Sequence, residues 1–441
     1  MEKILFISLG CDKNLVDSEQ MIGLLTEHGY ELTYEKENAD VIVINTCAFI
    51  GDAKEESINT ILECSQYKEN GQCKALIVCG CLAERYFSEI QQEIPEVDGI
   101  IGATAFDEII DVINGCLNNN KTFRRADINR SVYLKGHRSL STGGHYAYLK
   151  ISDGCNKHCT YCAIPNFKGK YRSVPMEDLL EDAKALADMG VKELILVAQE
   201  TTLYGIDLYG EKKLHELLRK LCQINGIMFI RLLYVYPEEI YDELIEVIKT
   251  EDKICNYLDM PIQHASDNIL KKMGRRTTKA DLISIIEKLR DNIPDIAIRT
   301  TLITGFPSES DSDFNELIDF VETIRFDRLG VFTYSAEEGT KAAEMDDQID
   351  TDIAERRRDE IMALQQEIAY EDAEKSIGKR YLCIIEGNDS ETNVYVGRTY
   401  KDAPDVDGLI FIETDENLMT GDLAYVNVTG AYEYDLIGEL D

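Results

Sequence analysis

Cys155-Asn156-Lys157-His158-Cys159-Thr160-Tyr161-Cys162 is the stretch that decides how the rest of the chain is interpreted. It places three cysteines within eight residues, on a loop that we expect to follow a strand. Soft thiolate ligands suit iron–sulfur clusters or zinc. Three thiolates on a four-iron cluster leave one iron open to a substrate or cofactor. Zinc, with His158 as the fourth ligand, is the alternative, but His158 and Cys159 are adjacent and zinc ligands usually have two or more residues between them.

The motif opens a long alternation of strand-like and helical stretches, which we assign to a domain of residues 141–372. Six strand–helix units in a row predict an open or partial (β/α)6 barrel. The strand-like runs are 146–152, 193–198, 229–233, 257–260, 297–303 and 328–333, and a charged helix over about 352–375 closes the series.

The same alternation occurs earlier, in residues 1–118, and predicts an open parallel α/β sheet covered by helices. Its strand-like runs are 4–9, 41–45, 75–79 and 99–102, and its helical stretches are 14–28, 53–66, 83–93 and 107–117. Residues 119–140 have the composition of a linker. The chain as a whole is therefore expected to be α/β.

A third domain is expected over residues 373–441, where short strand-like runs are separated by Gly, Asn and Asp. This texture predicts a small antiparallel β-barrel. The runs are 381–386, 393–398, 409–413 and 423–429. Three domains agree with a length of 441 residues, which is too long for one ordinary core.

A second group of cysteines follows the predicted N-terminal strands. Cys11, Cys47 and Cys81 each lie just beyond the carboxyl end of a strand-like run. Because functional groups gather at that edge of a parallel sheet, three cysteines far apart in sequence are expected to meet in space. A small buried hydrophobic role is the alternative for each of them.

Thirteen cysteines argue for metal or thiol chemistry, because we expect a cytoplasmic location and disulfide frameworks are rare there. No apolar run approaches the length of a membrane span. Cys79 is ambiguous beside Cys81, and we expect Cys79 to belong to the strand and Cys81 to the loop. The remaining cysteines are interpreted as structural: Cys64, Cys73, Cys116, Cys222, Cys255 and Cys383.

The charge of the chain points away from nucleic acid. The net charge is −36, and residues 373–441 hold five Lys or Arg against fifteen Asp or Glu, a balance of −10. Such a barrel disfavours contact with a phosphate backbone. It can instead steer a basic protein, although an acidic surface that serves only solubility stays open. Asp405 and Asp407 are our choice for its exposed face.

The Cys-x3-Cys-x2-Cys spacing, with Tyr161 before the last cysteine, resembles the radical S-adenosylmethionine (SAM) superfamily. The resemblance implies that Cys155, Cys159 and Cys162 hold a [4Fe-4S] cluster whose open iron binds SAM. It also implies that SAM is cleaved to a 5′-deoxyadenosyl radical, with an external electron donor supplying the electron. Tyr161, Gln199 and Gly305 would then lie near the bound SAM.

Both cysteine groups together, in this domain order, resemble the methylthiotransferase family, whose members end in a TRAM β-barrel. The resemblance covers nearly the whole chain. It implies a second [4Fe-4S] cluster on Cys11, Cys47 and Cys81, which supplies or carries the transferred sulfur and methyl group. One SAM donates the methyl group, and a second SAM provides the radical that activates a carbon–hydrogen bond.

Two branches of that family differ in substrate. The tRNA branch typically reads Gly-Cys-Gln-Met-Asn at the first cysteine and Tyr-Ser-x-Arg-x-Gly-Thr near the end of the barrel. This chain has Gly10-Cys11-Asp12-Lys13-Asn14 and Tyr334-Ser335-Ala336-Glu337-Glu338-Gly339-Thr340. Both resemble the branch that modifies an aspartate of protein twelve of the small ribosomal subunit, as does the run from Cys162 to Lys170.

We therefore expect a methylthiotransferase whose partner is this basic ribosomal protein, alone or within the ribosome, and we regard tRNA as a poor substrate. Modification of adenosine in tRNA is the alternative within the family. A cluster-bearing regulator without catalytic activity is the alternative outside it. Formation of 5′-deoxyadenosine from SAM would separate an enzyme from a regulator.

Overall fold

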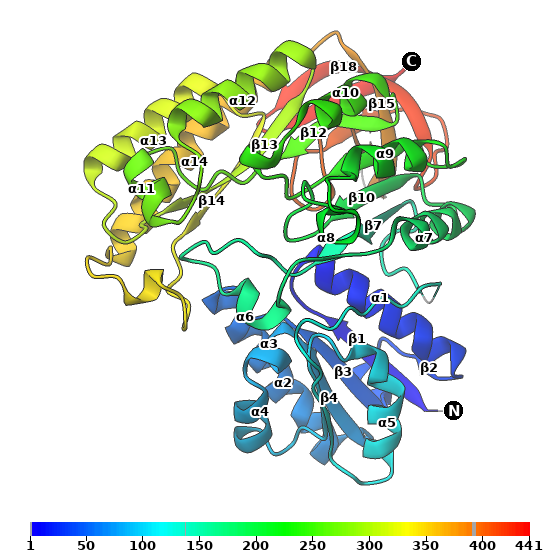
Figure 1. Ribbon diagram of the computed structural model, residues 1–441. Helices are drawn as coiled ribbons and strands as arrows, with labels where there is room; N and C mark the ends of the chain where they lie inside the picture. The colour runs from blue at the N-terminus through cyan, green and yellow to red at the C-terminus, as the bar shows by residue number, and fades with distance from the viewer. Residues whose placement is uncertain (1, 137, 390–393) are drawn as a thin grey trace. The chain divides into compact units, whose positions relative to one another are not determined.

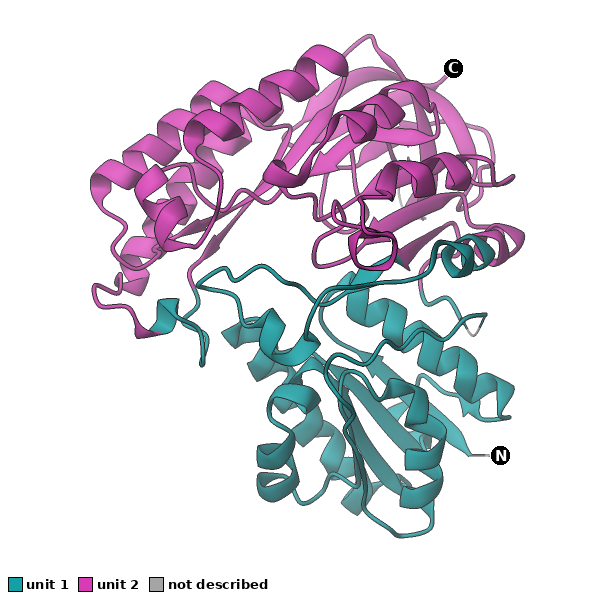
Figure 2. Ribbon diagram, in the orientation of Figure 1, with its two compact units in different colours: residues 1–141, 150–182, 335–343 teal, residues 142–149, 183–334, 344–441 magenta. Residues whose placement is uncertain are grey.

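The computed structural model describes residues 2–136, 138–389 and 394–441. The chain divides into two compact units, each of which is described by itself (Figure 2). Unit 1 comprises residues 1–141, 150–182 and 335–343, and unit 2 comprises residues 142–149, 183–334 and 344–441.

Unit 1 is built on a parallel sheet with the strand order β2-β1-β3-β4-β5-β6. Figure 1 labels its first four strands, β1 to β4. The central strand β3 reads Val-Ile-Val-Ile-Asn-Thr and is buried along its whole length, as expected for a parallel strand covered on both faces. The strands are β1 (Lys3–Ser8), β2 (Glu31–Leu32), β3 (Val41–Thr46), β4 (Ala75–Gly80), β5 (Gly99–Ile101) and β6 (Thr122–Arg124).

Helices cover both faces of this sheet and confirm the predicted α/β layers. One apolar core includes Ile61 of α2 and Ile90 of α4, and the other includes Met21 of α1 and Val112 of α5. The predicted helix over 83–93 is interrupted at Tyr86, where one helix ends and the next begins. The helical elements are α1 (Asp12–Glu27), η1 (Lys36–Asn38), α2 (Gly51–Asn70), α3 (Cys81–Arg85), α4 (Phe87–Glu93), η2 (Phe106–Glu108) and α5 (Ile109–Leu117).

Residues 119–140, which have the composition of a linker, contribute the sixth strand. Thr122–Arg124 pairs in parallel with Gly99–Ile101. The Thr122 amide also donates to the Asp98 carbonyl at 2.9 Å. Three residues are too few to show a strand period, so the pairing depends on the edge that β5 presents.

The cysteine loop and its surroundings complete unit 1. The predicted strand over 146–152 is divided: β7 (Tyr146–Lys150) ends before Ile151, and β8 (Ser152–Asp153) pairs antiparallel with β9 (Arg172–Ser173). Helix α6 (Ile164–Lys168) follows the cysteine loop.

The second six-stranded sheet has the order β14-β13-β12-β11-β10-β7 and confirms the predicted open series of strand–helix units. Thr278 and Ser310 begin two of its helices with capping boxes. The strands beyond β7 are β10 (Glu193–Val197), β11 (Phe229–Leu232), β12 (Ile254–Asp259), β13 (Ala297–Thr304) and β14 (Arg328–Thr333). The helices are α7 (Met176–Asp188), α8 (Ile206–Tyr209), α9 (Leu214–Cys222), η3 (Pro237–Glu239), α10 (Asp242–Thr250), α11 (Asp267–Lys272), α12 (Lys279–Asn292), α13 (Asp311–Ile324), η4 (Ala342–Glu344) and α14 (Thr351–Glu374).

The C-terminal residues form the predicted small barrel, which is closed in the order β15-β16-β17-β19-β18. Its strands are β15 (Arg380–Asp389), β16 (Val394–Arg398), β17 (Ile410–Glu413), β18 (Leu423–Tyr432) and β19 (Asp435–Leu440). The predicted run from Asn393 begins one residue outside the described part of the chain. β19 was not predicted, and it closes the barrel through a parallel pairing with β17, so the barrel is not wholly antiparallel.

The choice of Asp407 as an exposed carboxylate is wrong. Its side chain is 1% exposed and pairs with Arg299 at 3.3 Å. It also accepts hydrogen bonds from the Tyr257 hydroxyl at 2.7 Å and the Ala403 amide at 2.9 Å. Asp405 is exposed, as expected.

In the described residues of both units, no helix is long and apolar enough to cross a membrane.

Candidate metal centres

Cys11, Cys47 and Cys81 lie at one edge of the N-terminal sheet. Cys11 precedes α1, and Cys47 directly follows β3. Cys81 directly follows β4 and is the first residue of α3, so its predicted place in a loop is wrong. Because β1, β3 and β4 are parallel neighbours, their carboxyl ends, and with them the three cysteines, share an edge.

The three thiols of this group are close enough to influence one another. A Cβ atom at Gly10, whose φ is +89°, would lie 2.9 Å from the Cys47 Sγ, so only glycine fits beside that thiol. Burial raises the pKa of the Cys81 thiol to about 12, and negative charge on Cys11 or Cys47 raises it further. The Lys168 ammonium acts in the opposite direction and lowers the pKa of Cys81.

Two asparagines tie the cysteine-bearing segments together, and sequence reasoning missed both. The Asn14 side-chain amide donates to the Thr46 carbonyl at 3.0 Å, and its Oδ1 lies 3.5 Å from the Cys81 Sγ. The Asn45 amide donates to the Asn14 carbonyl at 2.9 Å. Asn14 belongs to the quoted motif around Cys11, which was the available signal. These bonds hold the three segments in register.

Cys79 and Cys81 belong to different cores of the sheet. The Cys79 side chain is fully buried in the core on the α1 and α5 face of the sheet, whereas Cys81 belongs to the opposite core. Burial raises the pKa of the Cys79 thiol strongly. The other cysteines interpreted as structural are also buried: Cys64, Cys73, Cys116, Cys222, Cys255 and Cys383.

The second cysteine group lies on the loop between β8 and α6. Cys155 and Cys159 are each 8% exposed. The Lys157 amide donates to the Cys155 Sγ at 3.3 Å, and the Cys162 amide donates to the Cys159 carbonyl at 3.1 Å. Burial raises the pKa of the Cys162 thiol to about 12, although a hydrogen bond from Ile164 opposes it; charge on Cys159 and Cys155 raises it further.

A single zinc ion would need several side chains that converge on one position. Across residues 2–136, 138–389 and 394–441, no three Cys, His, Asp or Glu side chains do so. A four-iron cluster binds each thiolate at a different iron, so its ligands need not converge on a point. His158, the fourth ligand required by the zinc alternative, is exposed.

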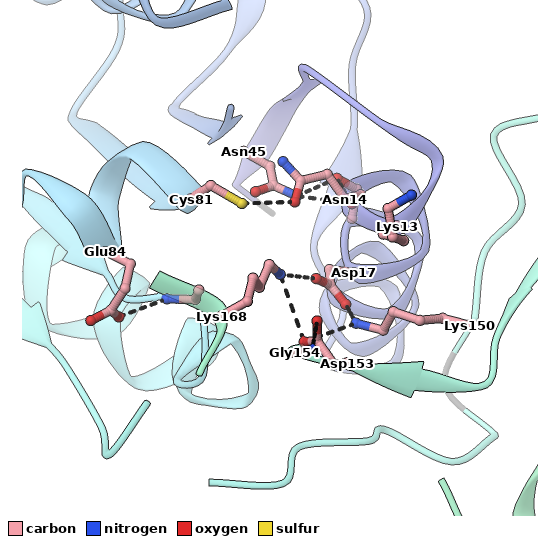
Figure 3. Close-up of polar contacts among 12 residues, drawn as sticks. Lys13, Asn14, Asp17, Asn45, Cys81, Glu84, Lys150, Asp153, Gly154 and Lys168 are labelled. Carbon is pink, nitrogen blue, oxygen red and sulfur yellow. Dashed lines mark hydrogen bonds and ion pairs between the residues drawn. The ribbon is translucent and has the colours of Figure 1, made fainter. Parts of the chain in front are cut away.

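A buried charge network connects the segments that carry the two cysteine groups (Figure 3). Asp17 of α1 forms ion pairs with Lys150 and, at 3.3 Å, with Lys168. Both lysines also lie within 4 Å of Asp153, at 3.8 and 3.7 Å. Gly154, just before Cys155, donates its amide to Asp153 at 3.0 Å. The network thus links α1, β7, β8 and α6.

Lys168 places a cation near the N-terminal cysteines. Burial acts to lower the pKa of Lys168, but Asp153 and Asp17, followed by the Cys81 and Cys11 thiols, raise it well above its usual value. The Lys168 ammonium therefore stays charged beside these thiols. Sequence reasoning did not single out Lys168, although it lies in the quoted run from Cys162 to Lys170.

The three residues expected near SAM belong to different units. Tyr161 is a half-buried residue of unit 1. In unit 2, Gln199 lies two residues beyond β10 and Gly305 directly follows β13, so both are at carboxyl ends of parallel strands. Gly305 has φ +73°, and a Cβ there would lie 2.3 Å from the Ala354 Cβ, so the backbone itself requires glycine.

A three-cysteine loop that follows the first strand of an open six-stranded sheet, whose strands β10 to β14 pair in parallel, is the arrangement of a radical SAM enzyme. The model of the radical SAM superfamily matches residues 149–321. The uncharacterized protein family UPF0004 matches residues 3–102, and the TRAM domain matches residues 377–440.

Solved structures share this fold at low identity. The radical SAM methyltransferase TsrM from Kitasatospora setae is 12% identical, with a TM-score of 0.55 and 75% of each chain covered. The cobalamin-dependent SAM radical enzyme OxsB is 14% identical, with a TM-score of 0.53 over 83% of this chain and 56% of its own.

Curated relatives match from end to end. The ribosomal protein uS12 methylthiotransferase RimO of Lachnoclostridium phytofermentans is 58% identical over 99% of both chains. The protein of the same name from Acetivibrio thermocellus is 52% identical over 100% of this chain and 98% of its own. The chain belongs to the RimO family of ribosomal protein uS12 methylthiotransferases, and it is therefore an enzyme of the methylthio-transferring radical SAM class.

Proposed function

We propose that this enzyme adds a methylthio group to the β-carbon of an aspartate in ribosomal protein uS12. The observation that carries the proposal is the end-to-end match, at 58% identity, to a relative named for that reaction. The motifs around Cys11 and Glu337 support it, since both differ from the pattern typical of the tRNA branch. A ribosomal target supports a cytoplasmic location, which belongs to the same proposal.

Two [4Fe-4S] clusters are the cofactors of this proposal. Cys155, Cys159 and Cys162 would hold one, and Cys11, Cys47 and Cys81 would hold the other. When bound, these groups and SAM supply the radical, the sulfur and the methyl group, with electrons from an external donor. Both donor sets fit, because each offers three soft thiol ligands. Burial raises the pKa of the Cys81 and Cys162 thiols, and bound iron would favour their thiolate forms.

The chain itself shields and orients these thiols. The Lys157 amide donates to the Cys155 Sγ, a bond that stabilises negative charge on sulfur. The Lys168 ammonium places a further positive charge near the N-terminal thiols. Burial of Cys155 and Cys159 limits access of water, which a reactive intermediate requires.

Tyr161, Gln199 and Gly305 are the proposed SAM contacts. Gln199 and Gly305 follow strands of one parallel sheet, at the edge where such folds bind ligands. Tyr161 lies in the loop between two proposed cluster ligands, Cys159 and Cys162.

The C-terminal barrel supports a basic protein partner. Besides the balance of −10, its Arg398 is buried and 1% exposed, so this cation contributes nothing to the outer surface. A cluster of carboxylates on and after β17 is exposed: Glu413, Asp415 and Glu416. Negative surface of this kind attracts a basic protein and repels a phosphate backbone.

Mass spectrometry of ribosomal proteins and tRNA from a strain that lacks the gene tests the substrate. Loss of the methylthio group from the uS12 aspartate, with tRNA unchanged, is the expected result. Loss confined to tRNA would overturn the substrate assignment.

Iron and sulfide analysis tests the cofactors separately. About eight iron atoms per chain are expected for two four-iron clusters. Removing either cysteine group by triple Cys→Ala substitution should halve that content. About four iron atoms in the unaltered protein, or no loss in the Cys11/Cys47/Cys81 variant, would contradict the two-cluster proposal.

A further inference from the structure

Residues 335–343 belong to unit 1, although their neighbours in the chain, Tyr334 and Glu344, belong to unit 2 (Figure 2). The chain thus leaves one compact unit after β14, contributes nine residues to the other and then returns. Residues 335–343 are called the excursion below. Their hydrogen bonds and ion pairs show which segments of unit 1 the excursion connects.

Glu337 anchors this excursion. Its side chain is 3% exposed and pairs with Lys54 and Arg85, each at 2.8 Å. The Ser335 hydroxyl donates to its Oε1 at 3.0 Å. Burial acts to raise the pKa of Glu337, but the bonds from Lys54 and Arg85 outweigh it and lower the pKa. The carboxylate is therefore a buried anion held by two cations and one hydroxyl.

The cations that hold Glu337 belong to the segments that carry the N-terminal cysteines. Arg85 lies in α3, which begins at Cys81. The same guanidinium donates to the carbonyl of Ala48, next to Cys47, at 2.9 Å and to the Glu338 carbonyl at 2.8 Å. One end of the excursion is thus fixed to two of the three N-terminal cysteine segments.

The other end of the excursion contacts the second cysteine group. The Ala342 amide donates to the Thr160 carbonyl at 2.9 Å, and Thr160 directly follows Cys159. A tight turn connects the two ends, because the Thr340 hydroxyl donates to the Glu337 carbonyl at 2.7 Å and the Thr340 amide donates to it at 3.1 Å.

We propose that residues 335–343 form a strap that holds the two cysteine groups in a fixed relation, and that Glu337 is its positioning residue. Glu337 stands where the tRNA branch of the family typically has Arg. On this proposal, Glu337 affects the reaction by positioning the N-terminal domain and not by touching the target. The effect of the strap on product formation rests on the proposed function, because that product is methylthiolated uS12. It matters because errors of about 1 Å in the relation of reacting groups can cost on the order of 100-fold in rate.

Hydrogen–deuterium exchange of the cluster-free chain tests the strap without any reaction. In Glu337→Gln, the Ala342 amide and the amides of residues 155–162 are expected to exchange about 10- to 100-fold faster, the range for loss of hydrogen bonds to a charged group. Glu338→Gln is the matched control, since Glu338 is exposed and its carboxylate accepts a 3.3 Å hydrogen bond from the Tyr86 hydroxyl, without an ion pair to Lys54 or Arg85 in the described part of the chain. Faster exchange confined to residues 335–338, or none at all, would overturn the proposal.

A coupling measurement with the cluster-loaded protein tests the consequence. The yield of methylthiolated uS12 per 5′-deoxyadenosine should fall about tenfold in Glu337→Gln, because the two groups no longer keep their relation. The charge swap Glu337→Arg with Arg85→Glu should recover part of that yield, since it restores an ion pair at the same place. Equal loss of both products, or no recovery by the swap, would show a merely structural role.

A milder variant covers the case in which Glu337→Gln does not fold. Ser335→Ala removes only the hydroxyl that donates to Glu337 and accepts the Gly51 amide at 3.4 Å. Ser335→Ala should speed exchange at the same amides as Glu337→Gln, but by a smaller factor. Exchange rates equal to those of the unaltered protein would count against the strap. If uS12 proves not to be the target, the exchange measurement still decides the proposal.

Discussion

The two units bury charge for different purposes. All six cysteines of the two groups lie in unit 1, together with the network of Asp17, Lys150 and Lys168. Unit 2 buries charge at least as deeply, around Glu193, but without a thiol group of this kind. These buried polar groups in unit 1 therefore belong to the proposed reaction site, whereas those around Glu193 in unit 2 hold two parts of the fold together.

In unit 2 the buried charges join the open sheet to the C-terminal barrel. Glu193 of β10 accepts a hydrogen bond from Arg231 of β11 at 2.7 Å and forms an ion pair with Arg398 of the C-terminal barrel at 2.7 Å. Arg398 also pairs with Glu386 at 2.6 Å. Burial acts to raise the pKa of Glu193, but Arg398 and Arg231 outweigh it and lower the pKa to about 2. These charges are paired within the protein.

The cysteines of the two groups in unit 1 differ from these paired charges because their thiols are neutral until they ionise. Burial raises the pKa of the thiols of Cys81 and Cys162 to about 12, so near neutral pH they remain protonated without a cation from outside the chain. A buried carboxylate that already has its arginine needs no further partner, whereas the thiols proposed as cluster ligands would gain their positive charge from bound iron, which favours the thiolate. The variants below test this distinction.

The largest effect is expected for Cys155→Ala. Two thiolates hold a cluster poorly, and losing a ligand should exceed the roughly 100-fold cost of losing a group that only supports one. Formation of 5′-deoxyadenosine should fall to background. Cys116→Ala, which alters a buried thiol of unit 1 outside both groups, should keep it. Undiminished 5′-deoxyadenosine formation in Cys155→Ala would refute the ligand assignment.

Asp407→Lys should give the next largest effect, on stability. It replaces the buried partner of Arg299 with a like charge, and removing one member of a buried pair costs about 3–5 kcal/mol. Urea unfolding of the cluster-free protein measures this loss. Asp415→Lys, at an exposed position of the same barrel, should change the free energy of unfolding by less than about 0.5 kcal/mol. Equal effects of both variants would mean that Asp407 does not join the barrel to the sheet.

His264 should make unit 2 sensitive to acid. Burial lowers its pKa to about 3, with Arg357 acting in the same direction and Asp313 opposing both. The folded chain therefore binds fewer protons than the unfolded chain below pH 6.5. Stability is complete above that pH and falls by about 1.4 kcal/mol per pH unit toward pH 3, which is about 2 kcal/mol at pH 5.

Comparison of variants isolates this contribution. His264→Gln should flatten the fall in unfolding free energy between pH 7 and pH 5, because the group that titrates is gone. His28→Gln, at an exposed histidine, should keep the slope of the unaltered protein. Identical slopes in all three proteins would remove His264 from the account.

The smallest effect concerns the exposed carboxylates of the C-terminal barrel. Replacing Glu413, Asp415 and Glu416 with Gln should weaken association with uS12, by no more than about 1 kcal/mol per exposed charge pair. The loss should be evident at low salt and diminish as ionic strength rises, because exposed charges are screened over roughly 8–10 Å. Titration of labelled uS12 at two salt concentrations measures this, and a salt-independent loss would argue against steering.

Much of the fold could be predicted because burial leaves a local pattern. The apolar run of β3 predicts a strand, and the three strand ends predict that Cys11, Cys47 and Cys81 share an edge. The compact spacing from Cys155 to Cys162 needs no fold at all to be noticed.

What the sequence could not show depends on partners distant in the chain. β6 exists because β5 presents an edge to it, and Asp407 is internal because Arg299 and Tyr257 meet it from another domain. Residues 335–343 follow a strand of unit 2 yet contact unit 1 segments through Glu337. The local pattern of apolar and polar residues does not predict such long-range contacts.

The central claim is tested most directly by incubating the reconstituted enzyme, a reductant and SAM with uS12 and, separately, with prenylated tRNA. Mass spectrometry should show a gain of one methylthio group on an aspartate of uS12 and none on the tRNA. A gain on the tRNA alone would contradict the account of the substrate.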